Sequence, residues 1–297
     1  ESCGRICFAY PITAPQTLDR IRFLCEKTEI ILSLDTLACA QRYEAYFSSF
    51  GLSVSYLCIV DVGLDRFGVP PADAGSLVKQ IAASCPHLRF SGISSHPGQV
   101  YKESSPAGVR KVERQELDCL KAAKDSLFAE GFSRFLVHSG STPTFLSEAE
   151  SDVVDVLRPG NYVFHDAIQQ ALGACGFENC AMSVLAEIIS IRPDGRYLMN
   201  CGAKCLGLDK GAHGNSSING YGHIIEYPEA EVLSLSEEVG IIKSKKPLSL
   251  GEKIRIIPNH SCSTANLTSY AYILHGEDVA GLLSIDCRNN SRIPVID

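Results

Sequence analysis

Residues 5–157 alternate between short apolar segments and amphipathic segments of helical period, and this alternation limits the fold more than any other feature of the chain. Buried strands that alternate with helices form a parallel sheet, which the helices cover. The expected strands are Arg5–Ile12, Glu29–Leu34, Val54–Val62, Leu88–Ile93, Arg134–His138 and Val153–Leu157. The expected helices are Thr17–Lys27, Leu37–Phe50, Ala72–Ser84 and Val109–Glu130.

Six strands can belong to an open sheet or to part of a barrel. An open doubly wound sheet uses a glycine-rich turn for dinucleotides, and this turn is absent here. A closed (β/α)8 barrel needs eight strands. The chain opens at Glu1 without a methionine, directly before an apolar run. We therefore expect an α/β fold with a (β/α)8 barrel that is incomplete at its N-terminus and open beside the strand containing Ile6–Ile12.

The pattern changes after Arg158-Pro159-Gly160, where long helical segments end. Short strands separated by Gly, Asn and Pro turns are typical of an antiparallel β domain. These strands are expected at Met182–Ile191, Arg196–Asn200, His223–Tyr227, Lys253–Ile257 and Ala271–Leu274. We place the barrel at residues 1–165 and the β domain at residues 166–297.

Charge and composition exclude several classes of function. The net charge is −7 and no basic run stands out, which argues against a nucleic-acid partner. No apolar stretch reaches the roughly 20 residues of a membrane helix. The 13 cysteines are scattered, which favours free, mostly buried thiols in a reducing, cytoplasmic setting. The spacing of Cys201, Cys205 and His213 allows a structural zinc site, but no second cysteine pair follows.

Three loops follow expected strands and carry polar side chains. Asp61–Gly68 is either a glycine turn or a functional loop at the C-terminal end of a strand, where barrel enzymes place their chemistry. His96–Tyr101 brings together an imidazole, an amide and a phenol, which fits a pocket or a hydrogen-bonded loop. Ser139–Thr144 offers glycine, hydroxyls and a helix start, which suit a phosphate or an ordinary capped turn. Asn200–Lys204 is a further glycine turn that could add backbone donors.

The segment Pro258–Asn266 contains His260 and Cys262, two residues apart. In an extended segment, side chains at this spacing point to the same side. Imidazole and thiolate are good zinc ligands, and a pair of them leaves coordination positions open for chemistry. The alternative is a buried cysteine beside a hydrogen-bonded histidine.

Taken together, these segments resemble the D-serine dehydratase-like family of fold-type-III pyridoxal-phosphate (PLP) enzymes. The matching segments, in order, are Asp61–Gly68, His96–Tyr101, Ser139–Thr144, Arg158–Phe164, Asn200–Lys204 and Pro258–Asn266. The family has an N-terminal PLP barrel and a C-terminal β domain, in agreement with the division above. The resemblance extends over almost the whole chain, and the order and spacing of the segments make it specific.

The resemblance implies roles for individual residues. Gly140, Ser141 and Thr142 would hold the PLP phosphate, with help from Gly202 and Ala203. The residues implied to line the ring and substrate pocket are His96, Gln99, Tyr101 and Tyr162. His260 and Cys262 would bind zinc. The implied partners are a small D-hydroxy amino acid substrate and a second subunit of a homodimer.

The implied activity is a zinc- and PLP-dependent D-serine dehydratase that forms pyruvate and ammonia. The ring withdraws electrons and zinc polarises the β-hydroxyl group. The His-x-Cys pair resembles the dehydratase branch, since related aldolases more often have a carboxylate at the second position. The alternatives are an aldolase acting on D-threonine or D-3-hydroxyaspartate, and a PLP-binding protein without turnover.

The chain departs from the family pattern at three points. The family's Schiff-base lysine lies in a segment that is not found here, so the catalytic lysine is not assigned and we expect it upstream of Glu1. Val239 stands where the family often has histidine. Asn200 stands where the glycine turn usually begins with aspartate.

Overall fold

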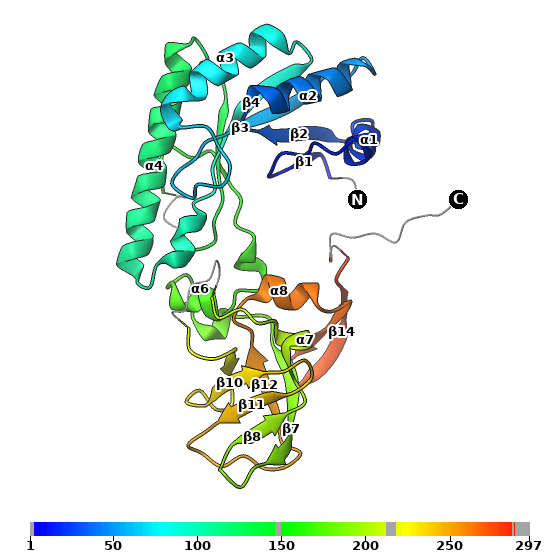
Figure 1. Cartoon of the computed structure of the whole chain (residues 1–297), viewed down its shortest axis with the longest axis vertical. Helices are drawn as coiled ribbons and strands as arrows, with labels where there is room; N and C mark the ends of the chain where they lie inside the picture. Colours follow the sequence, from blue (N-terminus) through cyan, green and yellow to red (C-terminus); the bar gives the residue numbers. More distant parts are fainter. Residues whose placement is uncertain (1–2, 146–149, 212–217, 287, 289–297) are drawn as a thin grey trace, which may run out of the picture. The chain divides into compact units, whose positions relative to one another are not determined.

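The structure is a computed structural model that describes residues 3–145, 150–211, 218–286 and 288. The chain divides into two compact units (Figure 1). The first comprises Glu1–Val100 and Ala107–Gly160, and the second comprises Tyr101–Pro106 and Asn161–Asp297. The sequence-based boundary at residue 165 falls in the segment that follows Gly160.

The first unit is built on a six-stranded parallel sheet in the order β1-β2-β3-β4-β5-β6. Its strands are β1 (Arg5–Cys7), β2 (Glu29–Leu34), β3 (Val54–Ile59), β4 (Leu88–Ser94), β5 (Leu136–Ser139) and β6 (Val156–Leu157). Its helices are α1 (Pro15–Leu24), α2 (Leu37–Ser48), α3 (Ala74–Ser84) and α4 (Pro106–Ala129). Among the described residues, β1 and β6 are the two edges of the sheet, so the expected open part-barrel is confirmed.

Apolar runs that are buried on both faces of the strands place the core of the first unit between sheet and helices. In β2, Leu32 and Leu34 are fully buried in one cluster with Tyr43 and Phe47 of α2. The helices lie along the outer side of the strands (Figure 1). Helix α2 begins after Thr36, whose side chain accepts a hydrogen bond from the backbone of the first turn, as an N-cap residue does.

The second unit contains a six-stranded antiparallel sheet in the order β10-β11-β8-β7-β12-β9, as expected for a β domain. Its strands are β7 (Val184–Ile191), β8 (Tyr197–Met199), β9 (His223–Ile224), β10 (Glu231–Leu235), β11 (Gly240–Lys243) and β12 (Lys253–Ile257). Its short helices are α6 (Ala167–Ala171), α7 (Ala203–Leu206) and α8 (Ser261–Asn266). Strands β10 and β11 and all three helices are absent from the sequence-based expectations.

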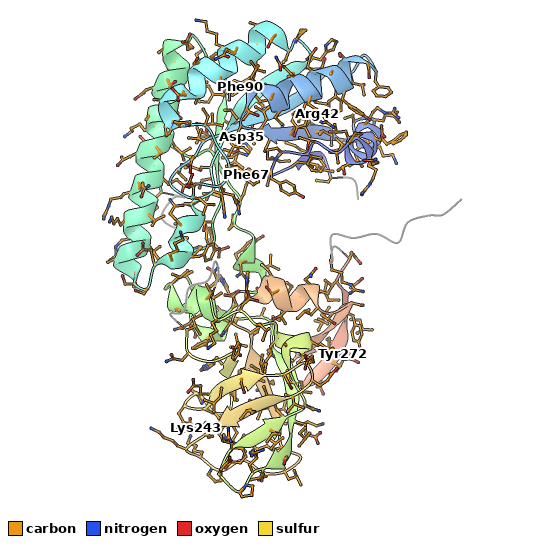
Figure 2. The ribbon with its side chains drawn as sticks, in the orientation of Figure 1. Asp35, Arg42, Phe67, Phe90, Lys243 and Tyr272 are labelled. Carbon is orange, nitrogen blue, oxygen red and sulfur yellow. The ribbon has the colours of Figure 1, made fainter. Side chains whose placement is uncertain are left out.

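A separate hairpin consists of β13 (Tyr270–His275) and β14 (Asp278–Ser284). Its large apolar side chains are exposed, among them Tyr272, which Figure 2 labels, and Leu282. Single-turn 3-10 helices lie at Pro71–Asp73, Gly98–Lys102, Asn161–Val163 and Phe177–Asn179.

The twelve described cysteines are all free. Only four of them are buried, so the expectation of mostly buried thiols is wrong: five are partly exposed and three are exposed. Neither apolar core includes Cys3, Cys7, Cys205 or Cys262. No helix in the described part of the chain is long and apolar enough to cross a membrane.

Candidate functional site

The first unit contains a cavity of about 410 Å³. The polar side chains that line it include Cys7, Asp61, Arg66, His96 and Arg158. They stand on β1 or on the loops that follow β3, β4 and β6, so they gather at the C-terminal edge of the parallel sheet. Barrel enzymes place their chemistry at this edge.

A buried polar network lies behind this cavity. The Glu116 carboxylate is fully buried and accepts hydrogen bonds from Ser95 Oγ at 2.5 Å and Ser139 Oγ at 2.8 Å. Arg158 Nη2 donates to the Ser95 carbonyl at 3.2 Å. The network fixes the two loops that carry His96 and Gly140 to helix α4, and burial keeps its bonds from exchanging with water.

Arg158 is a candidate that the sequence interpretation missed as a site residue. Burial lowers the pKa of its guanidinium, while the neighbouring Cys7 thiol and the Glu116 carboxylate raise it. Its Nε is buried without a hydrogen-bond partner. A half-buried cation with a free donor on a cavity wall suits an anionic or polar ligand atom. The signal in the sequence is a charged residue directly after an apolar strand.

The loop after β4 divides between the two units. His96 lines the cavity, and its Nδ1 is hydrogen-bonded to the carbonyl of Gly140. Gln99 Nε2 donates to the Val62 carbonyl at 2.7 Å, and its Oε1 is buried without a partner. Tyr101 belongs to the second unit, where its hydroxyl accepts from Gln169 at 3.4 Å.

The predicted phosphate segment after β5 is buried. Ser141 and Thr142 are 3% and 2% exposed, and Ser141 Oγ has no hydrogen-bond partner. A side chain on Gly140 would lie 2.8 Å from the carbonyl oxygen of Arg158, so only glycine fits there. The helix start expected in this segment runs into residues 146–149, which lie outside the described residues.

The glycine turn before α7 lies in the second unit. Gly202 is packed so closely that a Cβ would lie 2.4 Å from the carbonyl oxygens of Ser236 and Glu237. The Ala203 N–H donates to Ser236 O at 2.8 Å, so this donor is already engaged. Tyr162, also in this unit, has an exposed side chain.

Two of the three departures from the family pattern, Asn200 and Val239, lie next to this turn. Asn200 Oδ1 accepts from the Glu187 N–H at 2.8 Å, a bond that an aspartate would also make. Val239 belongs to the tight turn in which Ser236 N donates to Val239 O at 2.8 Å. The same Ser236 carbonyl accepts from Ala203, so Val239 stands near the predicted phosphate turn.

His260 and Cys262 are not in an extended segment, which corrects the geometry that we expected. His260 is the residue before α8, and Cys262 lies in the first turn of that helix. Their side chains nevertheless lie close enough for the Cys262 thiol to influence the pKa of His260. Cys262 is exposed, so the alternative of a buried cysteine does not hold.

The surroundings of His260 are acidic. Its Nδ1 lies 3.6 Å from Asp209 Oδ1. The neighbouring Cys262 raises the pKa of His260 to about 9 against the opposing effect of burial, and the charges of Asp166 and Asp209 add to the rise. In the described residues, no group of three or more His, Cys, Asp or Glu side chains is arranged to hold a metal. A metal bound here would need further ligands from elsewhere. The alternative zinc site of Cys201, Cys205 and His213 stays a prediction, because His213 lies outside the described residues.

Two family profiles match the chain. The profile "Alanine racemase, N-terminal domain" covers residues 10–168, and "Putative serine dehydratase domain" covers residues 181–274. The first covers strands β2 to β6 of the parallel sheet, and the second covers all six strands of the antiparallel sheet.

Several enzymes are similar in sequence. D-threo-3-hydroxyaspartate dehydratase of Delftia sp. (strain HT23) is 29% identical over 272 residues, which are 86% of this chain and 70% of that protein. D-serine dehydratase of Dictyostelium discoideum is 29% identical over 284 residues, covering 88% and 70%. 3-Hydroxy-D-aspartate aldolase of Paracoccus denitrificans (strain Pd 1222) is 23% identical, covering 86% and 66%.

The solved structure of the Delftia enzyme superimposes with a TM-score of 0.84 at 25% identity, covering 94% of this chain and 77% of that one. Structures of two variants of the same enzyme match as well. One replaces a histidine by alanine, and the other replaces a cysteine two positions further on and is described as the metal-free form.

Proposed function

Because this chain belongs to the D-serine dehydratase-like family of PLP-dependent enzymes with the alanine racemase fold, we propose that it functions as a lyase that dehydrates small D-3-hydroxy amino acids. The proposed substrate is D-serine, and the proposed metal is zinc. The observation that carries the proposal is the contact between the His260 and Cys262 side chains at the start of α8. Zinc binding, PLP binding by the named residues and the choice of D-serine are all parts of this proposal.

The residues of the first unit fit the PLP phosphate and ring. Ser141 has a buried hydroxyl without a partner, and Gly140 packs against Arg158 so closely that no side chain would fit there. Ser141, Thr142 and the backbone of Gly140 would therefore hold the phosphate. His96 and Arg158 line the cavity, where the imidazole would face the ring and the guanidinium would offer a fixed positive charge. In the second unit, Gly202 is the better candidate than Ala203, whose N–H is engaged.

The pair of metal donors fits a site that keeps positions open. An imidazole and a thiol in contact are a suitable zinc pair, and the nearby carboxylate of Asp209 favours a cation. Two side chains do not complete a zinc shell, so water or the substrate would supply the other ligands. In the Delftia enzyme, the replaced histidine and cysteine have the same two-residue spacing as His260 and Cys262.

PLP supplies an electron sink for the charge left at the substrate α-carbon, and zinc supplies a Lewis acid for the hydroxyl leaving group. The chain's own part is to position these groups. His260 and Cys262 would hold the metal, and the buried loops after β4 and β5 would exclude water from the phosphate. No residue of this chain is assigned as the Schiff-base lysine.

Elimination and aldol cleavage differ in the bond that breaks. The residue at the second metal-ligand position, which is Cys262 here, distinguishes the two activities. A thiol stands at that position here, in Cys262. The two relatives at 29% identity are both dehydratases, whereas the aldolase is 23% identical. These observations favour elimination. Val239 favours a different substrate, because the family often has histidine at this position.

The test is a parallel assay of the full-length protein, loaded with PLP and Zn²⁺, on D-serine, L-serine, D-threonine and D-3-hydroxyaspartate. We expect pyruvate from D-serine, and little or none from L-serine. Replacing Cys262 by alanine should remove bound zinc and most of the activity while the PLP absorbance stays. Full activity after chelation would contradict the metal's role.

Other outcomes would move the protein elsewhere in the family. Glycine from D-threonine without pyruvate from D-serine would indicate an aldolase. Bound PLP with no product from any substrate would indicate a carrier. Oxaloacetate from D-3-hydroxyaspartate at a higher rate than pyruvate from D-serine would place the specificity nearer that of the Delftia enzyme.

A further inference from the structure

The carboxylate of Asp166 is fully buried in the second unit and is held by three donors. Its Oδ1 accepts from the Gln169 N–H at 2.9 Å. Its Oδ2 accepts from the Ser261 N–H at 2.9 Å and from Asn161 Nδ2 at 2.5 Å. A buried carboxylate is costly unless such bonds compensate it. The arrangement is therefore a built polar centre.

The donors come from two segments that are far apart in sequence. Gln169 lies in α6, where Asp166 is the N-cap, and Ser261 begins α8, 95 residues later. Two backbone bonds support the same contact, from Ala167 N to Pro258 O at 3.1 Å and from Ile168 N to Asn259 O at 3.2 Å. Helices α6 and α8 thus lie side by side (Figure 1).

Ser261 is fixed at both of its polar groups. Its N–H donates to Asp166, and its Oγ donates to Asn161 Oδ1 at 2.7 Å. Asn161 in turn donates to Asp166, which closes the network. Ser261 stands directly between His260 and Cys262 in the chain, so fixing its backbone fixes the directions in which both neighbouring side chains leave it.

We propose that Asp166 is a positioning residue for the metal site, because it holds Ser261 and thereby orients His260 and Cys262 toward a common point. This role rests on the proposed function. It is distinct from the capping of α6 alone, which would contribute to stability without affecting the metal affinity of the folded protein. Partners that orient metal ligands typically contribute 10- to 100-fold to affinity.

The experiment compares Asp166→Ala and Asp166→Asn with the parent protein, using Zn²⁺ alone as the probe. Competition with a chelator gives the affinity, and thiolate-to-cobalt absorption after Co²⁺ substitution reports whether Cys262 is bound. Hydrogen exchange of the α8 amides reports the position of the helix without any metal. Asp166→Asn keeps the side-chain shape and one oxygen for Ser261, so it serves if the alanine variant does not fold.

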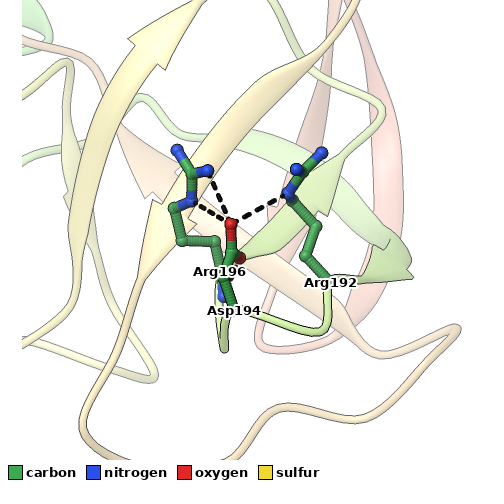
Figure 3. Close-up of polar contacts among 3 residues, drawn as sticks. All are labelled: Arg192, Asp194 and Arg196. Carbon is green, nitrogen blue, oxygen red and sulfur yellow. Dashed lines mark hydrogen bonds and ion pairs between the residues drawn. The ribbon is translucent and has the colours of Figure 1, made fainter.

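The matched control is Asp194→Asn. Asp194 lies in the exposed turn between β7 and β8, where it pairs with Arg192 and Arg196 (Figure 3). The same chemical change is made there in the same unit, but the turn shares no residue with α6 or α8. Zinc affinity and α8 exchange should match those of the parent protein.

We expect Asp166→Ala to weaken zinc binding roughly 10- to 100-fold, to reduce the cobalt–thiolate band and to speed exchange in α8. Asp166→Asn should change all three in the same direction by less. A folded variant with parental zinc affinity, or with unchanged α8 exchange, overturns the proposal. Failure of the proposed function has another pattern: the parent protein itself would bind no zinc, or Cys262→Ala would bind it equally well. That result would also overturn the role of Asp166.

Discussion

The two units hold their buried carboxylates by different kinds of donor. In the first unit, two of the bonds to Glu116 come from the hydroxyls of Ser95 and Ser139, which are free to rotate. In the second, two of the bonds to Asp166 come from backbone N–H groups. A hydroxyl that loses its partner can turn to another acceptor, whereas a buried backbone donor cannot. The second unit therefore depends more strongly on one polar side chain.

The apolar core is larger in the first unit than in the second. The first unit packs a continuous cluster between its sheet and helices, including Leu32, Tyr43 and Phe47 at 0% exposure. The second unit has a smaller cluster around Ile188, Ile254 and other residues of its short strands. The site in the first unit is thus supported by a large apolar core in addition to its polar network. The candidate metal site in the second unit depends mainly on hydrogen bonds. Mutations of each kind should affect the two units differently.

The largest expected effect is that of Leu32→Ala, which deletes a fully buried side chain in β2. We expect the free energy of unfolding to fall by about 3–5 kcal/mol, from lost transfer energy and the cavity left behind. Urea unfolding gives the size, and hydrogen exchange shows whether only the first unit opens more often. Leu185→Ala, on an exposed side chain of β7, is the control. Equal increases of hydrogen exchange in both units would mean that the two units unfold together. The proposed difference between their apolar cores would then have no effect on stability.

An intermediate effect is expected from Gly202→Ala. The added Cβ would lie 2.4 Å from two backbone carbonyl oxygens, and backbone is hard to displace. Overpacking of this kind costs typically about 1–3 kcal/mol. Gly160→Ala is the control, because no atom lies within 4 Å of a Cβ there. A thermal or urea midpoint equal to that of the control would show that the turn at Gly202 adjusts to a side chain without loss of stability, which would contradict this prediction.

Local sequence was sufficient where an element is decided by its own residues. Strand β2 has the expected bounds because its residues are mostly apolar and the strand ends before a polar pair. Helix α2 starts at the expected Leu37 because Thr36 caps it. In the first unit, the loops with His96 and Gly140 follow expected strands, and the structure joins these two residues by a hydrogen bond.

Sequence was insufficient where distant contacts decide the local structure. Pro258–Asn266 looks extended, but Asp166 fixes the start of α8 from 95 residues away. The short strands β10 and β11 are defined by pairing with each other and with β8, which no local pattern reveals. The sequence places Arg158 at the domain boundary and in a segment that resembles the family, but it does not indicate a site residue. The contact of Arg158 with the Ser95 carbonyl depends on a neighbouring strand, which the local sequence does not reveal.

The smallest expected effect concerns the pH dependence of the first unit. Burial, with a contribution from the nearby charge of Arg158, lowers the pKa of His138 from 6.5 to about 4. The side chain is 6% exposed, and its Nδ1 has no hydrogen-bond partner, so the neutral form is the one that the fold accepts. Between pH 6.5 and 4, the unfolded chain binds a proton at this position and the folded chain does not. Stability should therefore fall as the pH falls through this window, and the contribution should level off below about pH 4.

The expected loss is about 0.7 kcal/mol between pH 7 and pH 6, and the slope steepens to roughly 1.2 kcal/mol per pH unit near pH 5. The measurement is urea unfolding at a series of pH values for the parent protein and for His138→Gln, which cannot titrate. Because the substitution also changes stability by an amount that does not depend on this titration, the difference between the two slopes is the quantity that decides. Hydrogen exchange should assign the acid loss to the first unit, because His138 lies in β5. Parallel curves for the two proteins would show that His138 is protonated as readily in the folded chain as in the unfolded one, and the acid sensitivity would then have to come from other groups.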